Sequence, residues 1–248
     1  MSALSLTVLN NQPTIAVYAG DITADMAALT TVKAASALVG GLSSPSKMPC
    51  PGYSIPASTC KTGGALRSVP GSVCYSCYAA DDHSWLQQGK HRGLYAMPNV
   101  RNALAKRFAS LTDPMWVPAM TLLIKKSKHK YFRWHDSGDL QSVEHLENIA
   151  IVARNTPDVQ HWLPTREYNV VRAWRQNYAG APNLVIRASA HMIDKPAPAD
   201  FPHSSMVLSD PNAAGSAQQC LAWMNDNKCG GCRACWDTRV ATVWYHKH

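Results

Sequence analysis

Four short apolar segments recur through the middle of the chain, and each ends in polar residues. Their sequences are KYFRWHDSGD (130–139), VQHWLPTRE (159–167), NLVIRASA (183–190) and SMVLSD (205–210). Short runs rich in Val, Ile, Leu and aromatic residues are typical of strands buried in a parallel sheet. The pattern therefore predicts four parallel strands.

A helix is predicted between the first two of these strands. Ser142 can cap its amino end, and NTPD (155–158) ends it. Its apolar positions fall on one helical face: Val143, Leu146, Ile149, Ala150 and Ala153. Strand, helix and strand in this order form a parallel βαβ unit.

The fold class follows from this unit and from the length of the chain. With 248 residues, 46% hydrophobic and 16% charged, the chain is long enough for one large ordered domain. We expect a single α/β domain over residues 1–248, built as a partial or complete TIM-like (β/α) barrel. Two cysteine-rich segments, 50–77 and 220–236, would be attached to it.

Polar residues follow each predicted strand. In chain order they are Asp136, Ser137, Gly138 and Asp139, then Thr165, Arg166 and Glu167, then Arg187 and Ser189, then Ser209 and Asp210. Ligands bind beyond the carboxyl ends of strands in parallel α/β proteins. Asp139 could instead cap a helix, and Arg166 could pair with Glu167 at the surface. Four polar strand ends in succession favour a pocket.

The eight cysteines fall into two groups with none between Cys77 and Cys220. The first contains Cys50, Cys60, Cys74 and Cys77, and the second contains Cys220, Cys229, Cys232 and Cys235. They lie among Gly, Ser, Pro and Lys and show C-x2-C spacing, which is typical of metal or cluster ligands. We therefore expect both groups to bind metal.

The two groups differ in their expected ligand number. In CGGCRACW (229–236) three cysteines share one short loop, which favours an iron–sulfur cluster over zinc, with Cys220 as the natural fourth ligand. Cys60, Cys74 and Cys77 give C-x13-C-x2-C, with Cys50 as an optional fourth. Three ligands would leave one iron open for chemistry, whereas four would make an electron carrier or a structural site.

Charge and compartment signals are modest. A net charge of +8 and a pI near 9.1 favour an anionic partner such as nucleic acid, although the basic run IKKSKHK (124–130) reads more simply as a solvated helix end. The longest apolar stretch, MWVPAMTLLI (115–124), is too short for a membrane span, and the amino end has no export signal. We expect a cytoplasmic protein with reduced thiols.

Several motifs in order resemble one known family. CYSCYA (74–79), WHDSGDL (134–140), TRE, RAS and KCGGCRACW (228–236) are similar to a tailed-phage protein family named after gene product 88 of a mycobacteriophage. This resemblance implies a phage-encoded protein that works in the cytoplasm of a bacterial host.

A more distant similarity is to radical S-adenosylmethionine enzymes. It implies that Cys60, Cys74 and Cys77 hold a [4Fe–4S] cluster whose fourth iron binds S-adenosylmethionine. It also implies an electron donor that reduces this cluster. Ser137 and Gly138 loosely match the glycine-rich stretch of those enzymes. The cysteine spacing is C-x13-C-x2-C here, whereas those enzymes usually have C-x3-C-x2-C. The resemblance further implies a pocket for a small-molecule or nucleic-acid substrate and a second cluster on the C-terminal cysteines. The pocket residues would be Asp136, Asp139, Arg166 and Arg187.

A different class of function stays open. A zinc-stapled protein that binds nucleic acid would also use paired cysteines and a positive charge. No G-x-G-x-x-G or G-x4-G-K-[ST] sequence is present, so a nucleotide fold without metal is less favoured.

Overall fold

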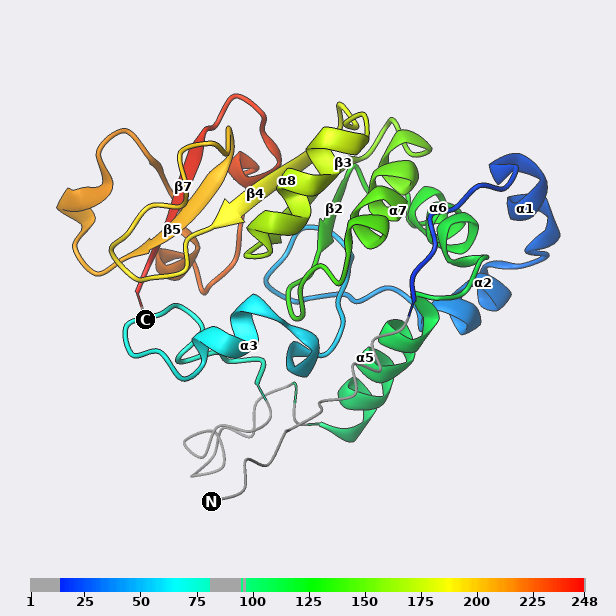
Figure 1. Cartoon of the computed structure of the whole chain (residues 1–248), viewed down its shortest axis with the longest axis horizontal. Coiled ribbons are helices and arrows are strands. Elements are labelled where there is room, and N and C mark those ends of the chain that lie inside the picture. Colours follow the sequence, from blue (N-terminus) through cyan, green and yellow to red (C-terminus); the bar gives the residue numbers. More distant parts are fainter. Residues whose placement is uncertain (1–13, 81–94, 96, 248) are drawn as a thin grey trace, which may run out of the picture.

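The computed structural model describes residues 14–80, 95 and 97–247, and its centre is a parallel sheet (Figure 1). Every pair of neighbouring strands runs parallel. In spatial order the seven strands are β1 (Gly52–Tyr53), β2 (Tyr131–Trp134), β3 (Gln160–Thr165), β4 (Leu184–Ser189), β5 (Ser204–Leu208), β7 (Thr242–His246) and β6 (Gln218–Gln219). The four predicted strands are confirmed as β2 to β5, and their carboxyl ends lie at one edge.

Helices cover one face of this sheet (Figure 1). They pack side by side in the order α1 (Ile22–Ala28), α6 (Trp116–Ser127), α7 (Val143–Arg154) and α8 (Tyr168–Asn177), with α2 (Val32–Val39) also against α6. The predicted helix is confirmed as α7, where the Ser142 hydroxyl accepts a hydrogen bond from the His145 N–H at 3.2 Å. The basic run at 124–130 forms the end of α6 up to Ser127 and continues through the C-cap residue Lys128 into the loop before β2.

Alternate strand residues face this helical layer. Phe132 and Trp134 of β2, Leu163 of β3, and Ile186 and Ala188 of β4 belong to one large buried cluster with the helices. Because successive side chains of a strand point to opposite faces, Arg133, Trp162 and Arg187 point the other way.

The C-terminal segment covers this second face. Its 3₁₀ turn η5 (Ala234–Trp236) packs on β3 and β4. The Trp236 indole N–H donates to the Phe132 carbonyl at 2.8 Å, and the Trp236 ring packs edge-on against Trp162 with 5.1 Å between centroids. The face that would line a barrel is therefore filled by side chains of the C-terminal segment.

The expectation of a complete barrel is wrong within the described residues. β1 and β6 form opposite edges of the sheet and do not pair. Each is only two residues long, which leaves too few backbone groups to close a ladder. What the structure shows is an open parallel α/β sheet.

The remaining elements are short or peripheral. They are η1 (Ala57–Thr59), α3 (Thr62–Leu66), α5 (Pro98–Ser110), η3 (Pro211–Ala214) and η4 (Ala222–Met224). No single helix in the described ranges is long and apolar enough to cross a membrane, although α1 and α2 together reach that length and composition across a 102° bend.

Candidate metal centre

The loop that carries Cys60, Cys74 and Cys77 lies over the carboxyl ends of the strands. Figure 1 shows its helix α3 on the side to which the arrowheads of β4 and β5 point. Lys61 Nζ donates to the Gln141 carbonyl beyond β2 at 2.7 Å. Thr62 donates through its N–H and hydroxyl to the two carboxylate oxygens of Glu167, just beyond β3, at 2.8 and 2.7 Å. The cysteine loop is thus anchored at the expected edge.

A backbone contact anchors the same loop beyond β4. The Val73 N–H donates to the His191 carbonyl at 2.9 Å, and the Ile193 N–H donates to the Gly71 carbonyl at 3.0 Å. Ser72 and Met192 form the antiparallel bridge between these two bonds. Three successive strand ends therefore hold one cysteine loop.

Two of the three thiols face a common point. A Cβ added at Gly63 would lie 3.4 Å from the Cys74 sulfur and 3.8 Å from the Cys60 sulfur. Burial raises the pKa of both thiols, and Cys77 lies close enough to raise both further. The loop thus gathers Cys60, Cys74 and Cys77, and Gly63 leaves room for their sulfurs.

Charged groups of both signs surround these thiols. After burial, the neighbouring Asp139 is the largest cause of the raised pKa of Cys60, whereas Arg166 is the largest influence that lowers the pKa of Cys74. The Arg166 Nε is buried without a hydrogen-bond partner among the described residues. Arg166 can therefore supply a free donor and a positive charge to an anion at this site.

Asp139 holds the end of β3 in place instead of capping α7. Its carboxylate accepts hydrogen bonds from the Thr165 hydroxyl at 2.6 Å, the Arg166 N–H at 2.9 Å and the Leu140 N–H at 2.8 Å. Burial raises the pKa of Asp139 to about 6, and the bonds from Thr165 and Arg166 oppose the rise. Its oxygens are occupied by the protein, so its role at this site is to position Arg166.

The rest of the HDSGD segment is tied to the chain that leaves β1. The Ser137 hydroxyl donates to the Ile55 carbonyl at 2.9 Å, and the Asp136 N–H donates to the Ser54 hydroxyl at 3.2 Å. The Tyr78 hydroxyl donates to the Asp136 carbonyl at 2.8 Å. One carboxylate oxygen of Asp136 accepts from the Tyr95 hydroxyl at 3.1 Å, and the other is buried without a partner among the described residues.

Gly138 is required for this close approach. Its φ is +75°, and a Cβ there would lie 2.3 Å from Ile55 Cγ1 and 2.7 Å from the Ile55 carbonyl oxygen. The segment after β2 therefore packs directly against the cysteine-loop entrance. Asp136, Ser137, Gly138, Asp139 and Arg166 are all brought to this edge.

Arg187 lies elsewhere. Its fully buried guanidinium donates to five carbonyl oxygens on the second face of the sheet. Four of these acceptors, Ala234, Cys235, Asp237 and Ala241, belong to the C-terminal segment. The alternation of β4 sends Arg187 away from the helices and onto this segment, which it holds in place.

Cys50 does not join the other N-terminal cysteines. It is buried against Trp162 and Trp236, with Cys235 packed nearby. Burial raises its pKa to about 12, Arg133 opposes the rise, and Cys229 adds to it. Because Cys50 precedes β1 whereas Cys60 follows it, the two thiols are sent to opposite ends of that strand. The eight cysteines thus divide into three and five.

A cavity of about 310 Å³ lies among the C-terminal cysteines. Cys220, Cys229, Cys232 and Cys235 all line it, together with Trp236. The Tyr245 hydroxyl lies 3.4 Å from the Cys235 sulfur. Four thiols around one space match the grouping that the sequence predicts for this segment.

Neither group is drawn tightly around a single point. In the part of the chain that the structure describes, no three Cys, His, Asp or Glu side chains form a site for one metal ion. Zinc with four sulfurs at about 2.3 Å needs them packed closely together. A cubane spaces its cysteines more widely, because each sulfur binds a different iron. By donor type, cysteines alone can hold either a cluster or a four-cysteine zinc site.

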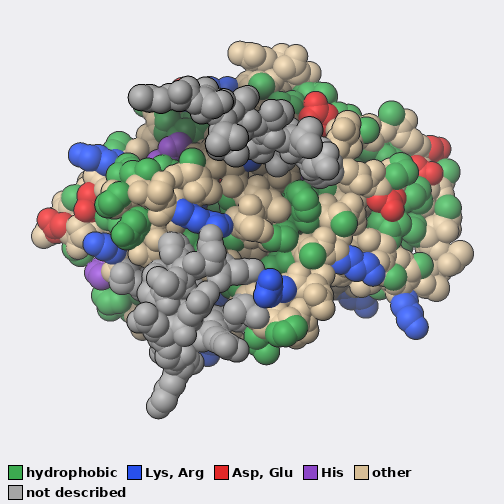
Figure 2. All heavy atoms as spheres, turned by 60° about the horizontal axis from the view of Figure 1, so that its bottom comes forward, with side chains coloured by type: hydrophobic (Ala, Val, Ile, Leu, Met, Phe, Trp, Pro, Cys, Tyr) green, Lys and Arg blue, Asp and Glu red, His purple; other side chains and the backbone are tan. Residues whose placement is uncertain are grey.

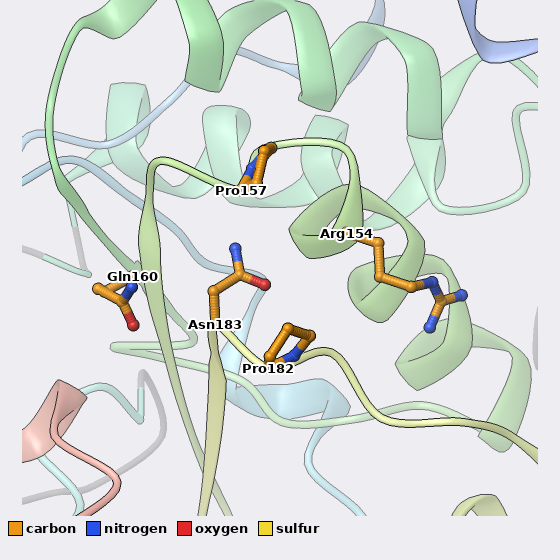
Figure 3. A pocket seen from close by; sticks show the side chains of 5 residues that line it. All are labelled: Arg154, Pro157, Gln160, Pro182 and Asn183. Carbon is orange, nitrogen blue, oxygen red and sulfur yellow. The ribbon is translucent and has the colours of Figure 1, made fainter.

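Another depression, of about 290 Å³, lies at the amino ends of β3 and β4 (Figure 3). It is lined by Arg154, Pro157, Gln160, Pro182 and Asn183. The Asn183 amide donates to three backbone carbonyls, and no lining residue is a nucleophile or a carboxylate. This depression offers no group suited to metal binding.

Sequence reasoning did not select Thr62, Arg133 or Trp162 as site residues, and it named Glu167 only among the polar strand ends. Glu167 had a visible signal, because it follows β3 directly at the predicted edge. The only sequence signal for Arg133 and Trp162 was the alternation of residues along their strands. Alternation shows which face of the sheet a side chain lies on but does not show what covers that face.

The fold and the cysteines define a parallel α/β protein with a cysteine loop over the carboxyl edge of its sheet and a second cysteine group in the segment that covers the second face. The chain belongs to the Gene product 88 family, a bacteriophage protein family whose model matches residues 19–247. The resemblance to this family is therefore confirmed over most of the chain. No curated protein and no solved structure matches this chain.

Proposed function

We propose that the protein is an iron–sulfur enzyme in which Cys60, Cys74 and Cys77 hold a [4Fe–4S] cluster with one iron free of protein sulfur. A second cluster on the C-terminal cysteines completes the proposal. The observation that carries it is the division of the cysteines, because Cys50 lies on the far side of β1 and leaves three thiols at the carboxyl edge. An open iron is where such a site does chemistry.

The position of the loop supports a radical S-adenosylmethionine mechanism. The three cysteines follow β1, and the SGD segment follows β2 at the same edge, as expected for a partial (β/α) barrel of that class. A cluster held by Cys60, Cys74 and Cys77 would supply one electron for the reductive cleavage of one C–S bond of S-adenosylmethionine.

The protein's own groups would bind and orient the cofactor. Arg166 offers a buried donor and a positive charge for a carboxylate. The unpartnered carboxylate oxygen of Asp136 offers an acceptor for an ammonium or a hydroxyl group. The carboxyl edge thus presents both signs of charge to a cofactor that carries both.

The alternative of a zinc-stapled nucleic-acid binder has less support. Among the described side chains on the face that Figure 2 views, Lys and Arg are dispersed between hydrophobic and uncharged ones and form no continuous basic stripe. Nucleic-acid tracks usually need such a stripe.

The test is anaerobic purification with iron, sulfide and zinc analysis, followed by electron spin resonance of the dithionite-reduced protein with and without S-adenosylmethionine. We expect a brown protein whose reduced signal changes when S-adenosylmethionine is added. Cys77→Ala should abolish this change because it removes a ligand of the open cluster. The matched control, Cys50→Ala, should retain it because Cys50 lies with the other group.

Two results would contradict the proposal. Colourless protein that contains zinc alone would show that no cluster is bound. The zinc-stapled alternative would then be tested by measuring the affinity for nucleic acid at increasing salt concentration. A signal that responds to S-adenosylmethionine in Cys77→Ala but not in Cys50→Ala would assign the open site to the other cysteines.

A further inference from the structure

Three buried N–H groups beside the C-terminal cysteines have no hydrogen-bond acceptor among the described residues. They are the Nε of Arg133, the Nε1 of Trp162 and the Nε of Arg233. Buried donors are nearly always paired, because burial removes the water that would otherwise accept from them. Three unpaired donors in one place indicate that an acceptor belongs there.

The two guanidinium groups are held against rings and sulfur. The Arg133 guanidinium carbon lies 4.7 Å from the centre of the Trp162 ring. Arg133 Nη1 lies 3.5 Å from the Met48 sulfur, which is 4.0 Å from the Cys229 sulfur. Arg133 is thus one side chain away from a cavity-lining thiol. Arg233 lies over the Tyr131 ring at 5.1 Å.

Neither arginine forms an ion pair with a carboxylate among the described residues. The ion pairs between described residues involve Arg154, Arg172 and Arg239, and none includes Arg133 or Arg233. Their nearest ionisable neighbours include Cys50 and Cys229, whose raised pKa values are caused by burial and opposed by both arginines. Burial lowers the pKa of Arg133, and Tyr78, Asp136 and Tyr245 outweigh this effect and raise it. A cluster held by the cysteines would add further negative charge beside both arginines.

We propose that Arg133 and Arg233 balance the negative charge of a cluster held by the C-terminal cysteines, and that Trp162 donates a further hydrogen bond towards its sulfur. The inference rests on the proposed iron–sulfur function and deepens it. Positive charge and N–H donors near sulfur make a cluster easier to reduce. Arg133 therefore makes the midpoint potential of the C-terminal cluster more positive, and it is a positioning and tuning residue.

The experiment isolates this cluster in the triple variant Cys60→Ala, Cys74→Ala, Cys77→Ala. Its midpoint potential is measured by anaerobic titration with dithionite, followed by absorption, for one-electron reduction. We expect Arg133→Met to shift the potential to more negative values and Arg133→Lys to shift it less. Arg172→Met is the matched control, because this arginine is half-exposed on α8 and pairs with Asp200. It should leave the potential unchanged.

Each other outcome decides the inference. An unchanged potential in Arg133→Met at equal iron content overturns it. If Arg133→Met holds no iron, recovery of iron in Arg133→Lys supports the charge role, and loss in both variants overturns it. A triple variant without iron overturns the C-terminal cluster itself, while the response of the wild-type protein to S-adenosylmethionine separately reports the open one.

Discussion

Thr62 donates two hydrogen bonds, one from its backbone and one from its hydroxyl, to the two carboxylate oxygens of Glu167. Thr62 lies in the cysteine loop two residues after Cys60, and Glu167 directly follows β3. This pair fixes the loop to the sheet. The position of the sulfurs therefore depends on a carboxylate that need not touch metal.

Glu167→Gln should loosen this connection. An amide presents one acceptor where the carboxylate presents two, and hydrogen bonds to a charged group contribute about 1.5–3 kcal/mol. We expect the free energy of unfolding of the apoprotein, measured with urea, to fall by about 1–3 kcal/mol, and the iron content of the N-terminal site to fall with it. Asp158→Asn, at an exposed position, is the control. Equal stability of the two variants would show that the pair does not anchor the loop.

Gly138→Ala should be strongly destabilising. The added Cβ meets Ile55 at 2.3 Å, and the φ of +75° disfavours a side chain. Left-handed backbone costs about 1–2 kcal/mol, and overpacking adds about 1–3 kcal/mol. Thermal unfolding should therefore show a loss of roughly 2–5 kcal/mol. At Gly64 a Cβ meets nothing within 4 Å, so Gly64→Ala should be neutral or slightly stabilising. A neutral Gly138→Ala would mean that this contact is not tight.

The elements that the sequence predicted correctly carry local signals. β2 to β5 have apolar runs, and α7 has a cap at Ser142 and a periodic face. β1 is two residues long and gives no such signal. Without β1, the sequence could not show that Cys50 and Cys60 leave opposite ends of one strand, so it grouped them together.

The same limit applies to Arg187. The alternation of residues along β4 shows that Arg187 points away from Ile186 and Ala188. The segment that covers its face of the sheet, however, comes from about 50 residues later in the chain. A strand pattern shows which side chains share a face and not what packs on it. Asp136, Asp139 and Arg166, by contrast, lie at the carboxyl edge, where topology alone sends them.

Asp139 should make stability depend on pH. Its pKa is raised to about 6 in the folded protein, chiefly by burial, from an ordinary value near 3.8. The folded state therefore binds more protons between these values, and this contribution to stability is present below pH 4 and is lost as the pH rises through 6. The expected loss is at most about 3 kcal/mol.

The readout is the difference in unfolding free energy between wild-type apoprotein and Asp139→Asn, measured with urea from pH 4 to 7. The comparison with the variant is needed because burial also lowers the pKa of His145 and His161 to about 3. These imidazoles stay neutral in the folded protein while the unfolded chain takes up protons, so their contribution to stability falls as the pH falls. Relative to the variant, the wild-type protein should lose stability as the pH rises. Parallel curves would show that Asp139 does not titrate in this range.

Arg187→Met should release the C-terminal segment. The substitution keeps an apolar stem but removes five hydrogen bonds to backbone carbonyls, including those of Ala234, Cys235 and Asp237. Hydrogen bonds from a charged group contribute about 1.5–3 kcal/mol each, so we expect a loss of at least about 3 kcal/mol. Amide hydrogen exchange should rise in residues 229–241 before it rises in α7, because the segment loses its attachment to β4.

The matched control is Arg175→Met on α8, which removes one exposed bond to the Asp200 carbonyl. It should leave exchange in residues 229–241 unchanged. Arg187→Met should also lower the iron bound by the C-terminal cysteines while the response to S-adenosylmethionine persists, because the carboxyl edge does not depend on Arg187. If the C-terminal iron and the response to S-adenosylmethionine were both lost at unchanged stability, Arg187 would instead belong to the open site, as we predicted from the sequence.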